Sequence, residues 1–459
     1  MISGDPKTPI KGSMFFFKGK EGLIGTGIRP GESVSISIGI DDTDSARRGM
    51  CTTYVATMVV ETLDTIPGLV FRDFPCLVRL NPQVPNKTRG NGALALHLWA
   101  EPGSEDEIFD TVCHLVSEHS VLEDPSTHPG IAMGAGDPPD ILREYYNSCL
   151  HRIVTRREAL EMAELAGLRT MGMKEGLGVI GAVAALGADF NRDQTFEIIA
   201  YRDPGDRGRE RGIDEDLVLR LDREVSETFY NYDYMNHKVC VVPASPCPVL
   251  FGVRGETPGA VVRGYNILRG EESPPATLFR TNQHTDAHLE RAAKIASLRP
   301  RSSYIVKGTV HGTPRSIPGG HVIFTLSDGS GQIDCAAYEP TKQFRGPVGK
   351  LRPGDLVRVY GSVRPADSRH GMTLNLEKVE IISLVDSVDT NPTCPRCGSR
   401  MESMGKGSGF RCRDRSCGFR DRTAGKVKLP IPRELAKGFY EPPPVAWRHL
   451  YRPLLRGAG

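Results

Sequence analysis

Four cysteines near the C-terminal end constrain the local fold more than any other feature of this sequence. They are arranged as C-x2-C, a spacer of fourteen residues and C-x4-C, and they are Cys394, Cys397, Cys412 and Cys417. Two such pairs, each on a tight turn, bring four thiolates onto one tetrahedral zinc ion with no position left open. The spacing therefore predicts a structural zinc site. The alternatives are an iron–sulfur cluster or a chance pairing of cysteines.

Basic residues gather around and after these cysteines. Residues 391–459 contain 15 Lys and Arg against 5 Asp and Glu, whereas the whole chain has a net charge of +2. Arginines, with Phe410 and Phe419, alternate with the cysteines in a pattern suited to phosphate contacts and base stacking. We expect a zinc ribbon at 391–425 and a basic tail at 426–459 that docks on a polyanion. A solvated basic face would give the same composition.

Residues 301–388 alternate apolar and polar residues in five runs separated by Gly and Pro turns. A helical stretch at 341–351 lies between the third and fourth runs. This order is typical of an OB-fold, a small barrel that binds single-stranded nucleic acid. Periodicity alone fits an SH3-like barrel equally well. The runs are 303–310, 321–328, 331–339, 355–363 and 374–384.

Three carboxylates follow a predicted strand in the N-terminal half. The strand covers residues 34–40, and Asp41, Asp42 and Asp44 stand at its carboxyl end, where α/β proteins place their sites. One aspartate here would cap the following helix, but three within four positions repel one another unless a cation neutralises them. Oxygen ligands of this kind suit Mg²⁺. The alternative is a purely structural role in the turn.

Two glycine-containing segments bear on a phosphate site. The first carries Lys87, Arg89 and Asn91, with glycines on both sides of Asn91 that let the backbone approach a ligand closely. The second, residues 176–181, reads G-x-G-x-x-G, but no predicted strand precedes it, so a closely packed glycine-containing helix is the better interpretation. An ordinary P-loop is excluded, because the chain has no G-x-x-x-x-G-K-[ST] motif.

Residues 236–300 read as strand, helix and strand, which predicts a ferredoxin-like unit. The strand at 93–100 and the helix at 105–119 are expected to complete it. The candidates for a substrate pocket are Tyr232, Asp233, His284, Asp286 and His288. Some of these residues also have a structural interpretation. Asp233 would cap a turn, and a histidine of segment 284–288 would form a buried pair with a carboxylate.

The remaining composition indicates an ordinary globular protein of several domains. Hydrophobic residues make up 39% and charged residues 25% of the 459 positions. Residues 1–33 are expected to be an N-terminal extension without the features of a signal peptide. The eleven cysteines are an odd number and do not suit a disulfide framework. We therefore expect a cytoplasmic setting and no membrane contact.

Together these motifs resemble those of a known family. "GIDDTDS" with "RGMCTTY", "RLNPQVPNKTRGNGA", "LFGVRGE" and "TNQHTDAH", followed by an OB-fold and a four-cysteine ribbon, is similar to the archaeal tRNA(Ile2) 2-agmatinylcytidine synthetases. The resemblance covers residues 35–425. It implies an unusual kinase-like, ATP-binding catalytic domain at 34–235, whose strands can interleave with those of the ferredoxin-like domain.

The resemblance also implies an activity. The family carries out an ATP-dependent ligase reaction on the wobble cytidine of tRNA(Ile2). The C2 position is activated by phosphorylation of O2, and the amine of agmatine then displaces the phosphate, so that the tRNA decodes AUA. Thr52 matches the family's threonine that accepts a phosphoryl group from ATP, and the three aspartates match its Mg²⁺–phosphate ligands. No partner protein is implied.

Elementary chemistry agrees with this implied reaction. The C2 oxygen of cytosine leaves only as a strongly basic ion, and phosphorylation makes it a good leaving group. Lys87 and Arg89, together with Mg²⁺, would support the transferring phosphoryl group. Agmatine carries a guanidinium and an amine, so its pocket should offer carboxylates and aromatic faces, such as Asp233, Tyr232 and segment 284–288. A carboxylate or a histidine of this set would deprotonate the amine.

Two other function classes remain open. A single-stranded nucleic-acid-binding protein would use the OB-fold and the ribbon without catalysis, and it would leave the acidic turn unexplained. A metal-dependent nuclease would use the same aspartates to cut a nucleic-acid chain without ATP.

Overall fold

The computed structural model describes residues 33–85, 87–88, 90–206, 209–270, 274–368 and 370–457. The expected N-terminal extension therefore lies almost wholly outside the described residues. Helices and strands of the N-terminal half are β1 (Val34–Asp41), α1 (Thr52–Leu63), β2 (Val70–Phe71), β3 (Cys76–Arg79), β4 (Gly92–Ala100), α2 (Glu105–His119), β5 (Gly130–Ala135), α3 (Asp140–His151), α4 (Arg156–Leu165), β6 (Arg169–Gly172) and α5 (Val179–Leu186).

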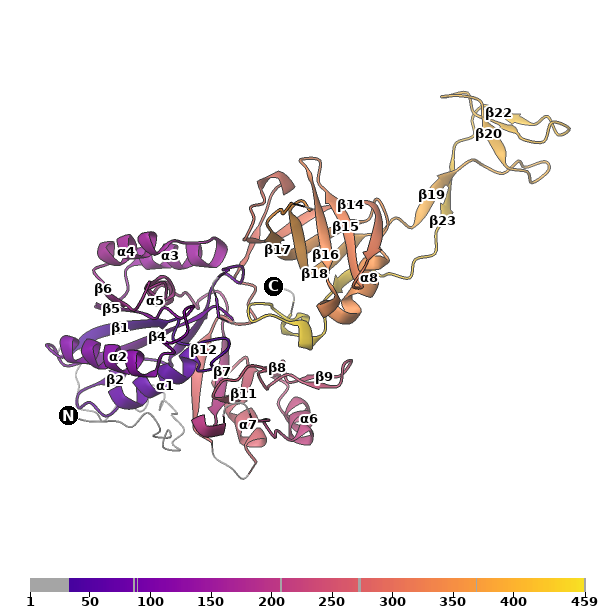
Figure 1. Cartoon of the computed structure of the whole chain (residues 1–459). Coiled ribbons are helices and arrows are strands. Elements are labelled where there is room, and N and C mark those ends of the chain that lie inside the picture. Colours follow the sequence, from indigo (N-terminus) through magenta and orange to yellow (C-terminus); the bar gives the residue numbers. More distant parts are fainter. Residues whose placement is uncertain are drawn as a thin grey trace.

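The N-terminal half is a sheet covered by helices on both faces (Figure 1). Its strands are antiparallel, in the order β6-β5-β1-β4-β3, with β2 paired to β4. The isoleucines of β1, among them Ile36 and Ile40, pack against α1 and α2. Small residues such as Ala95 and Ala132 face α3 and α5 and let these helices approach closely. This alternation of large and small residues follows the period of two along a strand.

The second half of the same sheet is a ferredoxin-like unit. Its elements are β7 (Thr195–Tyr201), α6 (Glu215–Glu224), β8 (Thr228–Phe229), β9 (Tyr232–Asp233), β10 (Lys238–Val239), β11 (Val249–Gly255), α7 (Pro258–Leu268) and β12 (Ala276–Thr281). The chain order β7-α6-β8-β11-α7-β12 is the βαββαβ order of that fold, and its strands lie in the order β12-β7-β11-β8. A parallel pairing of β12 with β3 joins the two halves.

The strands and helices that make up the ferredoxin-like unit differ from the expected ones. The strand and helix predicted to complete the ferredoxin-like unit are β4 and α2, and both belong to the N-terminal half. The expected boundary after residue 235 falls between α6 and α7, although Leu221 of α6 and Tyr265 of α7 share one core. The local pattern predicts the type of each element correctly, but the choice of sheet neighbours depends on contacts between distant residues.

The OB-fold prediction is confirmed. The barrel consists of β14 (Ser303–Ile317), β15 (His321–Ser327), β16 (Gln332–Ala337), α8 (Arg345–Gly349), β17 (Leu356–Arg364) and β18 (Thr373–Ser383), and β13 (Leu289–Arg291) pairs with β14. The barrel closes through β14–β17, and β16 runs parallel to β18. With the helix between the third and fourth strands, this connectivity is that of an OB-fold rather than an SH3-like barrel.

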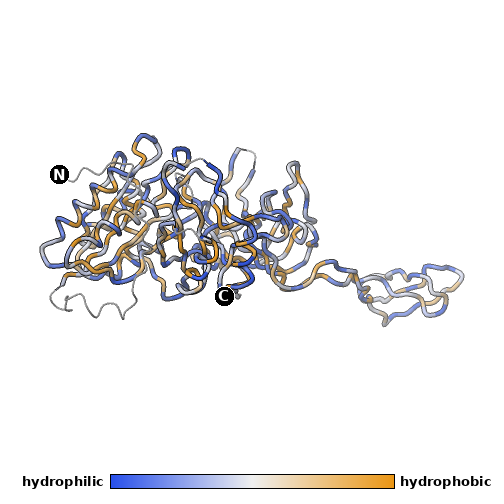
Figure 2. Tube along the Cα trace, turned by 90° about the horizontal axis from the view of Figure 1, so that it is seen from below, coloured by the Kyte–Doolittle hydropathy of each residue, from blue (hydrophilic) through white to orange (hydrophobic). Residues whose placement is uncertain are grey.

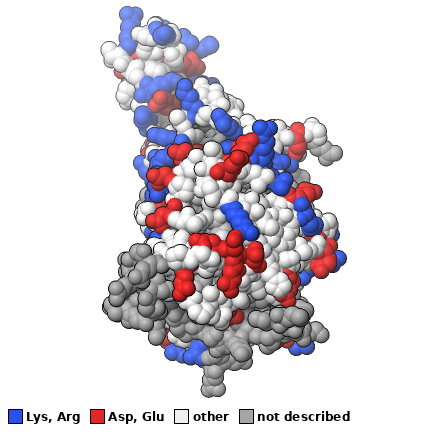
Figure 3. All heavy atoms as spheres, turned by 90° about the vertical axis from the view of Figure 1, so that its left-hand side faces the viewer, with Lys and Arg blue, Asp and Glu red and all other residues white. Residues whose placement is uncertain are grey.

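A two-stranded stalk carries the zinc ribbon away from the barrel (Figures 1 and 2). The stalk is β19 (Ser387–Thr390) with β23 (Val427–Pro430), and the ribbon is β20 (Met401–Ser403), β21 (Phe410–Cys412) and β22 (Arg420–Asp421). Its core consists of the cysteines and few other side chains. Figure 3 shows Lys and Arg gathered at this projecting end of the molecule. Among the described residues, no helix combines the length and the apolar character needed to cross a bilayer.

The segment expected to be a basic tail is instead folded back onto the body of the protein. β24 (Gly438–Tyr440) pairs with β18, and residues 441–456, here called the C-terminal strap, return between the barrel and the ferredoxin-like unit (Figure 1). Arg433 and Asp355 form a buried ion pair with N and O 2.7 Å apart. Part of the positive charge of this segment is therefore neutralised internally, which composition alone does not reveal.

Candidate active site

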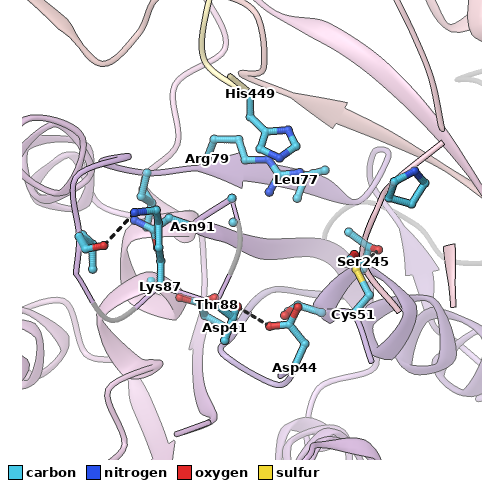
Figure 4. Close-up of a pocket in the computed structure, with 18 of the residues that line it drawn as sticks. Asp41, Asp44, Cys51, Leu77, Arg79, Lys87, Thr88, Asn91, Ser245 and His449 are labelled. Carbon is cyan, nitrogen blue, oxygen red and sulfur yellow. Dashed lines mark hydrogen bonds between the residues drawn. The ribbon is translucent and has the colours of Figure 1, made fainter. Parts of the chain in front are cut away.

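A cavity of about 830 Å³ opens at the carboxyl end of β1, between the N-terminal half and the ferredoxin-like unit. Its walls come from β1, the first turn of α1, the loop before β4, α5, β7, β11 and the C-terminal strap (Figure 4). Cavities of this size hold small-molecule ligands in other proteins. The site therefore lies where the acidic turn predicted it, at the end of a strand.

The three aspartates of the turn all line the cavity, but they do not form one set of ligands. A carboxylate oxygen of Asp41 accepts from the backbone N–H of Asp42 at 2.7 Å. Asp42 accepts from the backbone N–H of His128 at 2.9 Å, and Asp44 accepts from the hydroxyl of Thr88 at 2.7 Å (Figure 4). Within the described part of the chain, the four-cysteine cluster is the one close group of three or more potential metal ligands.

The aspartates are nevertheless electrostatically unusual. Burial raises the pKa of Asp41 well above its ordinary value, and the charge of Asp42 adds to the effect. Burial also raises the pKa of Asp42 to about 7. Carboxylates in such a position are stabilised by a proton or by a bound cation. The acidic turn thus has the chemistry of a cation site even though its side chains point to different partners.

The hydroxyl of Thr52 lies at the start of α1, beside this turn. Thr52 is buried, and its oxygen accepts a hydrogen bond from the hydroxyl of Thr43 at 3.2 Å. The N-terminal end of a helix has unpaired backbone N–H groups and a partial positive charge, which favour an anion such as a phosphate. Thr52, the residue that the family resemblance singles out, lines the cavity at this helix end.

The glycine-containing segment at the start of α5 allows close packing, as predicted. A Cβ atom on Gly181 would lie only 1.9 Å from Oδ2 of Asp41. Any larger residue here would push α5 away from the acidic turn. Gly181 thus lets the helix form the floor of the cavity directly beneath Asp41.

The loop before β4 brings two of the three predicted phosphate ligands to the cavity. The ammonium group of Lys87 donates to the carbonyl of Val84 at 3.1 Å (Figure 4). The side-chain amide of Asn91 donates to the carbonyl of Asn81 at 2.8 Å. Burial, with the nearby charge of Arg448, lowers the pKa of Lys87. The third predicted ligand, Arg89, lies outside the described residues.

The opposite wall holds a charged network that the sequence prediction missed. Glu197 on β7 is buried, pairs with Arg254 on β11 at 2.7 Å and accepts from the side-chain amide of Gln283. Gln283 in turn accepts from Nε of Arg79 on β3 at 3.2 Å. One available signal was the glutamate inside the apolar run "TFEIIAY", because a charge in a buried strand requires partners.

Three of the predicted agmatine-pocket residues do not line this cavity or the smaller one beside it. Asp233 accepts backbone hydrogen bonds from its own turn and from Val445 of the C-terminal strap, at 3.2 Å. Tyr232 donates to a carboxylate of α6, and Asp286 pairs with Lys378 of the barrel at 2.7 Å. For Asp233 the geometry is that of the turn cap considered as its alternative.

The two predicted histidines line a smaller cavity of about 490 Å³ that shares Lys87 and Tyr230 with the main one. Burial lowers the pKa of His284 to about 3, so its ring is neutral at physiological pH. Its Nδ1 lies 2.8 Å from the carbonyl oxygen of Tyr451, which can only accept, so Nδ1 donates. His288 lies 2.9 Å from a carboxylate oxygen of Glu377 on β18, the buried pair foreseen as the alternative.

The four cysteines converge as a zinc site requires. Their sulfur atoms all lie within 4.8 Å of one another, with Cys397 and Cys412 at 3.4 Å and Cys394 and Cys417 at 3.8 Å. Zinc–sulfur bonds near 2.3 Å in a tetrahedron place sulfur atoms about 3.8 Å apart. Hydrogen bonds from Ser399 lower the pKa of Cys397 to about 6, which favours the thiolate. The set fits a structural zinc ion.

An α/β half with an acidic ligand cavity, an OB barrel and a zinc ribbon together define a multidomain enzyme class that acts on nucleic acid. Family models match nearly the whole described chain. They are the TiaS TCKD domain at 37–175, the TiaS FLD domain at 176–288, the OB-fold nucleic acid binding domain at 304–382 and the TiaS C-terminal zinc ribbon domain at 391–435. The boundary expected after residue 235 falls inside the second match.

The chain is 41% identical over 421 residues to tRNA(Ile2) 2-agmatinylcytidine synthetase TiaS of Archaeoglobus fulgidus, a match that covers 91% of this chain and 97% of that protein. The relative of the same name from Methanosarcina mazei is also 41% identical, with the same coverage. The chain belongs to the TiaS family.

Solved structures agree with this assignment. The crystal structure of a TiaS–tRNA(Ile2)–ATP complex matches with a TM-score of 0.79 and 39% identity over 93% of this chain and 98% of that one. That of a TiaS–tRNA(Ile2)–AMPCPP–agmatine complex matches with a TM-score of 0.78 and 38% identity over 92% and 97%. Such similarity over the full length extends the relationship to all four domains.

Proposed function

We propose that this protein conjugates agmatine to C2 of the wobble cytidine of tRNA(Ile2) at the expense of ATP, with activation of the cytosine O2 by phosphorylation. The observation that supports this most strongly is the convergence of Asp41, Asp44 and Thr52 on one cavity, in a chain similar over its whole length to named synthetases. A binding protein without catalysis has no use for buried, mutually repelling carboxylates beside a helix N-terminus. The cytoplasm, where tRNA is modified, is the proposed location.

In this proposal the acidic turn and the N-terminal end of α1 handle the phosphates of ATP. The raised pKa values of Asp41 and Asp42 support a divalent cation there, and Asp41 and Asp44 would hold Mg²⁺. One or two carboxylates with phosphate oxygens and water suffice for this ion, so the divergent side chains are no obstacle. Bound Mg²⁺ would neutralise phosphate charge. Lys87 and Asn91 bind phosphate oxygens from the facing loop, with Arg89 as a further proposed ligand.

Thr52 receives the phosphoryl group in this scheme. Because the hydroxyl of Thr43 donates to the Thr52 oxygen, that oxygen is held in place while its own proton remains available to a base in the cavity. Arg79 and Arg254, on the opposite wall, supply positive charge toward a transferring phosphoryl group. The buried position of Glu197 between donors keeps this wall rigid.

For agmatine, the proposal retains His284 and His288, which line the adjoining cavity together with the rings of Tyr230 and Trp447. Aromatic faces suit a guanidinium group. We do not assign an agmatine contact to Tyr232, Asp233 or Asp286, because their side chains line neither cavity. The OB barrel and the projecting zinc ribbon bind the body of the tRNA in this proposal. The wobble base leaves its stack and enters the cavity.

The test is mass analysis of anticodon nucleosides after the purified protein is incubated with ATP, Mg²⁺, agmatine and an unmodified isoleucine tRNA transcript. We expect a mass gain equal to agmatine less one water on the wobble cytidine, absent when ATP is omitted. A transcript with uridine at the wobble position is the matched control. Tight tRNA binding with neither mass gain nor ATP consumption would instead support a binding protein, and chain cleavage without ATP would support a nuclease.

A further inference from the structure

The C-terminal strap is an integral part of the half that carries the main cavity, although it lies wholly beyond the matched ribbon domain, which ends at residue 435. The backbone N–H of His284 donates to the carbonyl of His449 at 2.7 Å, and that of Asp286 donates to the carbonyl of Leu450 at 2.8 Å. Leu450 and Tyr451 are almost fully buried. The backbone of the strap is thus hydrogen-bonded to the segment that follows β12.

Ion pairs fix the end of the strap beside β7 and β11, the two central strands of the ferredoxin-like unit. Arg456 is buried and pairs with Asp193, just before β7, at 3.0 Å and with Glu256, just after β11, at 2.5 Å. Arg452 also pairs with Asp193, at 2.9 Å. Bidentate, charge-assisted contacts of this kind hold an element in one orientation. The strap is therefore positioned rigidly relative to the main cavity.

His449 carries this rigidity into the network on the cavity wall. Its Nδ1 lies 3.0 Å from Oε1 of Gln283, a fully buried residue. The amide nitrogen of Gln283 donates to Glu197, which fixes Oε1 as the acceptor atom, so Nδ1 of His449 must carry a proton and donate. The same Oε1 accepts from Nε of Arg79 at 3.2 Å. One histidine proton thus orients the buried amide of Gln283 and, through its oxygen, the side chain of Arg79, which lines the cavity.

The other side of the His449 ring packs against the loop that carries Lys87 and Asn91 (Figure 4). A Cβ atom on Gly90 would lie 2.4 Å from Cδ2 of His449 and 2.6 Å from a terminal nitrogen of Arg79. The backbone of Gly90 is therefore in contact with the ring, and a larger residue here would displace the ring or the Arg79 side chain. His449 therefore contacts both this loop, here called the phosphate loop, and Gln283, and a terminal nitrogen of Arg79 also reaches the loop beside Gly90.

We propose that His449 is a positioning residue for the reaction: its Nδ1–H holds Gln283 and Arg79 in register with the phosphate loop. The kinetic test of this inference rests on the proposed function, whereas the structural test, by hydrogen exchange, is independent of it. The essential group is the donor at Nδ1, so an amide in that place should replace it. Asparagine presents its side-chain NH₂ close to the position of Nδ1, whereas alanine presents nothing.

The experiment compares wild type with His449→Asn, His449→Ala and, as a matched control, His114→Ala, whose ring is 72% exposed on α2. We expect His449→Ala to lower kcat for agmatine conjugation about 10- to 100-fold, with little change in the Kd for tRNA, because misplacement by about 1 Å costs rates of this order. His449→Asn should retain kcat within about threefold, and His114→Ala should match wild type.

Hydrogen exchange supplies the readout that needs no activity. His449→Ala should speed exchange in peptides covering residues 81–92, and His449→Asn should not. If wild type is active and His449→Asn is as impaired as His449→Ala in both readouts, or if His449→Ala behaves as wild type, the positioning role is overturned. An inactive wild type with the expected exchange pattern would instead refute the proposed function and leave the positioning contact supported.

Discussion

Nε2 of His288 lies 2.9 Å from a carboxylate oxygen of Glu377, in a buried contact that joins the end of the ferredoxin-like unit to strand β18 of the barrel. The hydroxyl of Ser362 donates to the other carboxylate oxygen at 3.0 Å. Burial alone would raise the pKa of Glu377, but the charge and hydrogen bond of His288 outweigh it and hold this pKa at about 2. The pair therefore joins the OB barrel to the half of the protein that carries the main cavity.

Glu377→Gln should lower the free energy of unfolding by about 3–5 kcal/mol, because removing one partner leaves the other buried without its counter-charge. Urea titration at neutral pH measures this. Glu434→Gln is the matched control, since that carboxylate is 81% exposed in its pair with Lys350 and should contribute less than about 1 kcal/mol. Equal effects of the two variants would contradict a special role for the buried pair.

The stabilising effect of Glu377 should also depend on pH in a defined direction. Its pKa in the folded protein, about 2, is below the ordinary value of 4.5, so the unfolded chain binds more protons in this range. The stabilisation is fully present above pH 4.5 and is lost as the pH falls toward 2. The difference in unfolding free energy between wild type and Glu377→Gln should therefore shrink below pH 4.5, and a constant difference would refute the assignment.

Asp41→Asn should stabilise the protein without Mg²⁺ and ATP while it abolishes ATP turnover. The pKa of Asp41 is raised by burial and by the charge of Asp42, so the ionised carboxylate is unfavourable at neutral pH without a cation. In EDTA, we expect Asp41→Asn to have a higher Tm than wild type. Addition of Mg²⁺ and ATP should not raise the Tm of the variant further, and its ATP turnover should fall about 100-fold or more. A lower Tm in EDTA would return Asp41 to a capping role.

The sequence predicts the local features of this protein well and the long-range ones less so. The cysteine spacing and the barrel strands were readable because the residues that determine them are near one another in the chain. The roles of Asp233 and of residues 426–459 could not be predicted. Asp233 depends on its contact with Val445, and Arg433 depends on its ion pair with Asp355, and only the folded chain brings these partners together. The hydrogen bond between Gln283 and Glu197 could not be predicted either, because the two residues are 86 positions apart in the chain.

Removal of zinc should unfold the ribbon without unfolding the catalytic half. The ribbon has few buried side chains besides its cysteines, so metal binding supplies most of its folding free energy. Cys397→Ser should lose zinc by elemental analysis and expose residues 391–425 to rapid hydrogen exchange. Cys113→Ser, at a half-buried position on α2, is the control and should keep its zinc. Protection of the ribbon in Cys397→Ser would show that the metal is dispensable.

Thr52→Val should abolish modification while tRNA binding stays nearly unchanged. Valine keeps the shape of threonine and removes the hydroxyl that we propose as phosphoryl acceptor, so the rate should fall about 1,000-fold or more. Thr57→Val is the matched control. Thr57 is equally buried one turn further along α1 but bonds to Thr277 and does not line the main cavity, so its loss should cost stability, about 1–3 kcal/mol, and not chemistry. Mass spectrometry after incubation with ATP should find a phosphate on the peptide containing Thr52 in wild type and in Thr57→Val but not in Thr52→Val. Full activity of Thr52→Val would assign the N-terminal end of α1 to nucleotide binding alone.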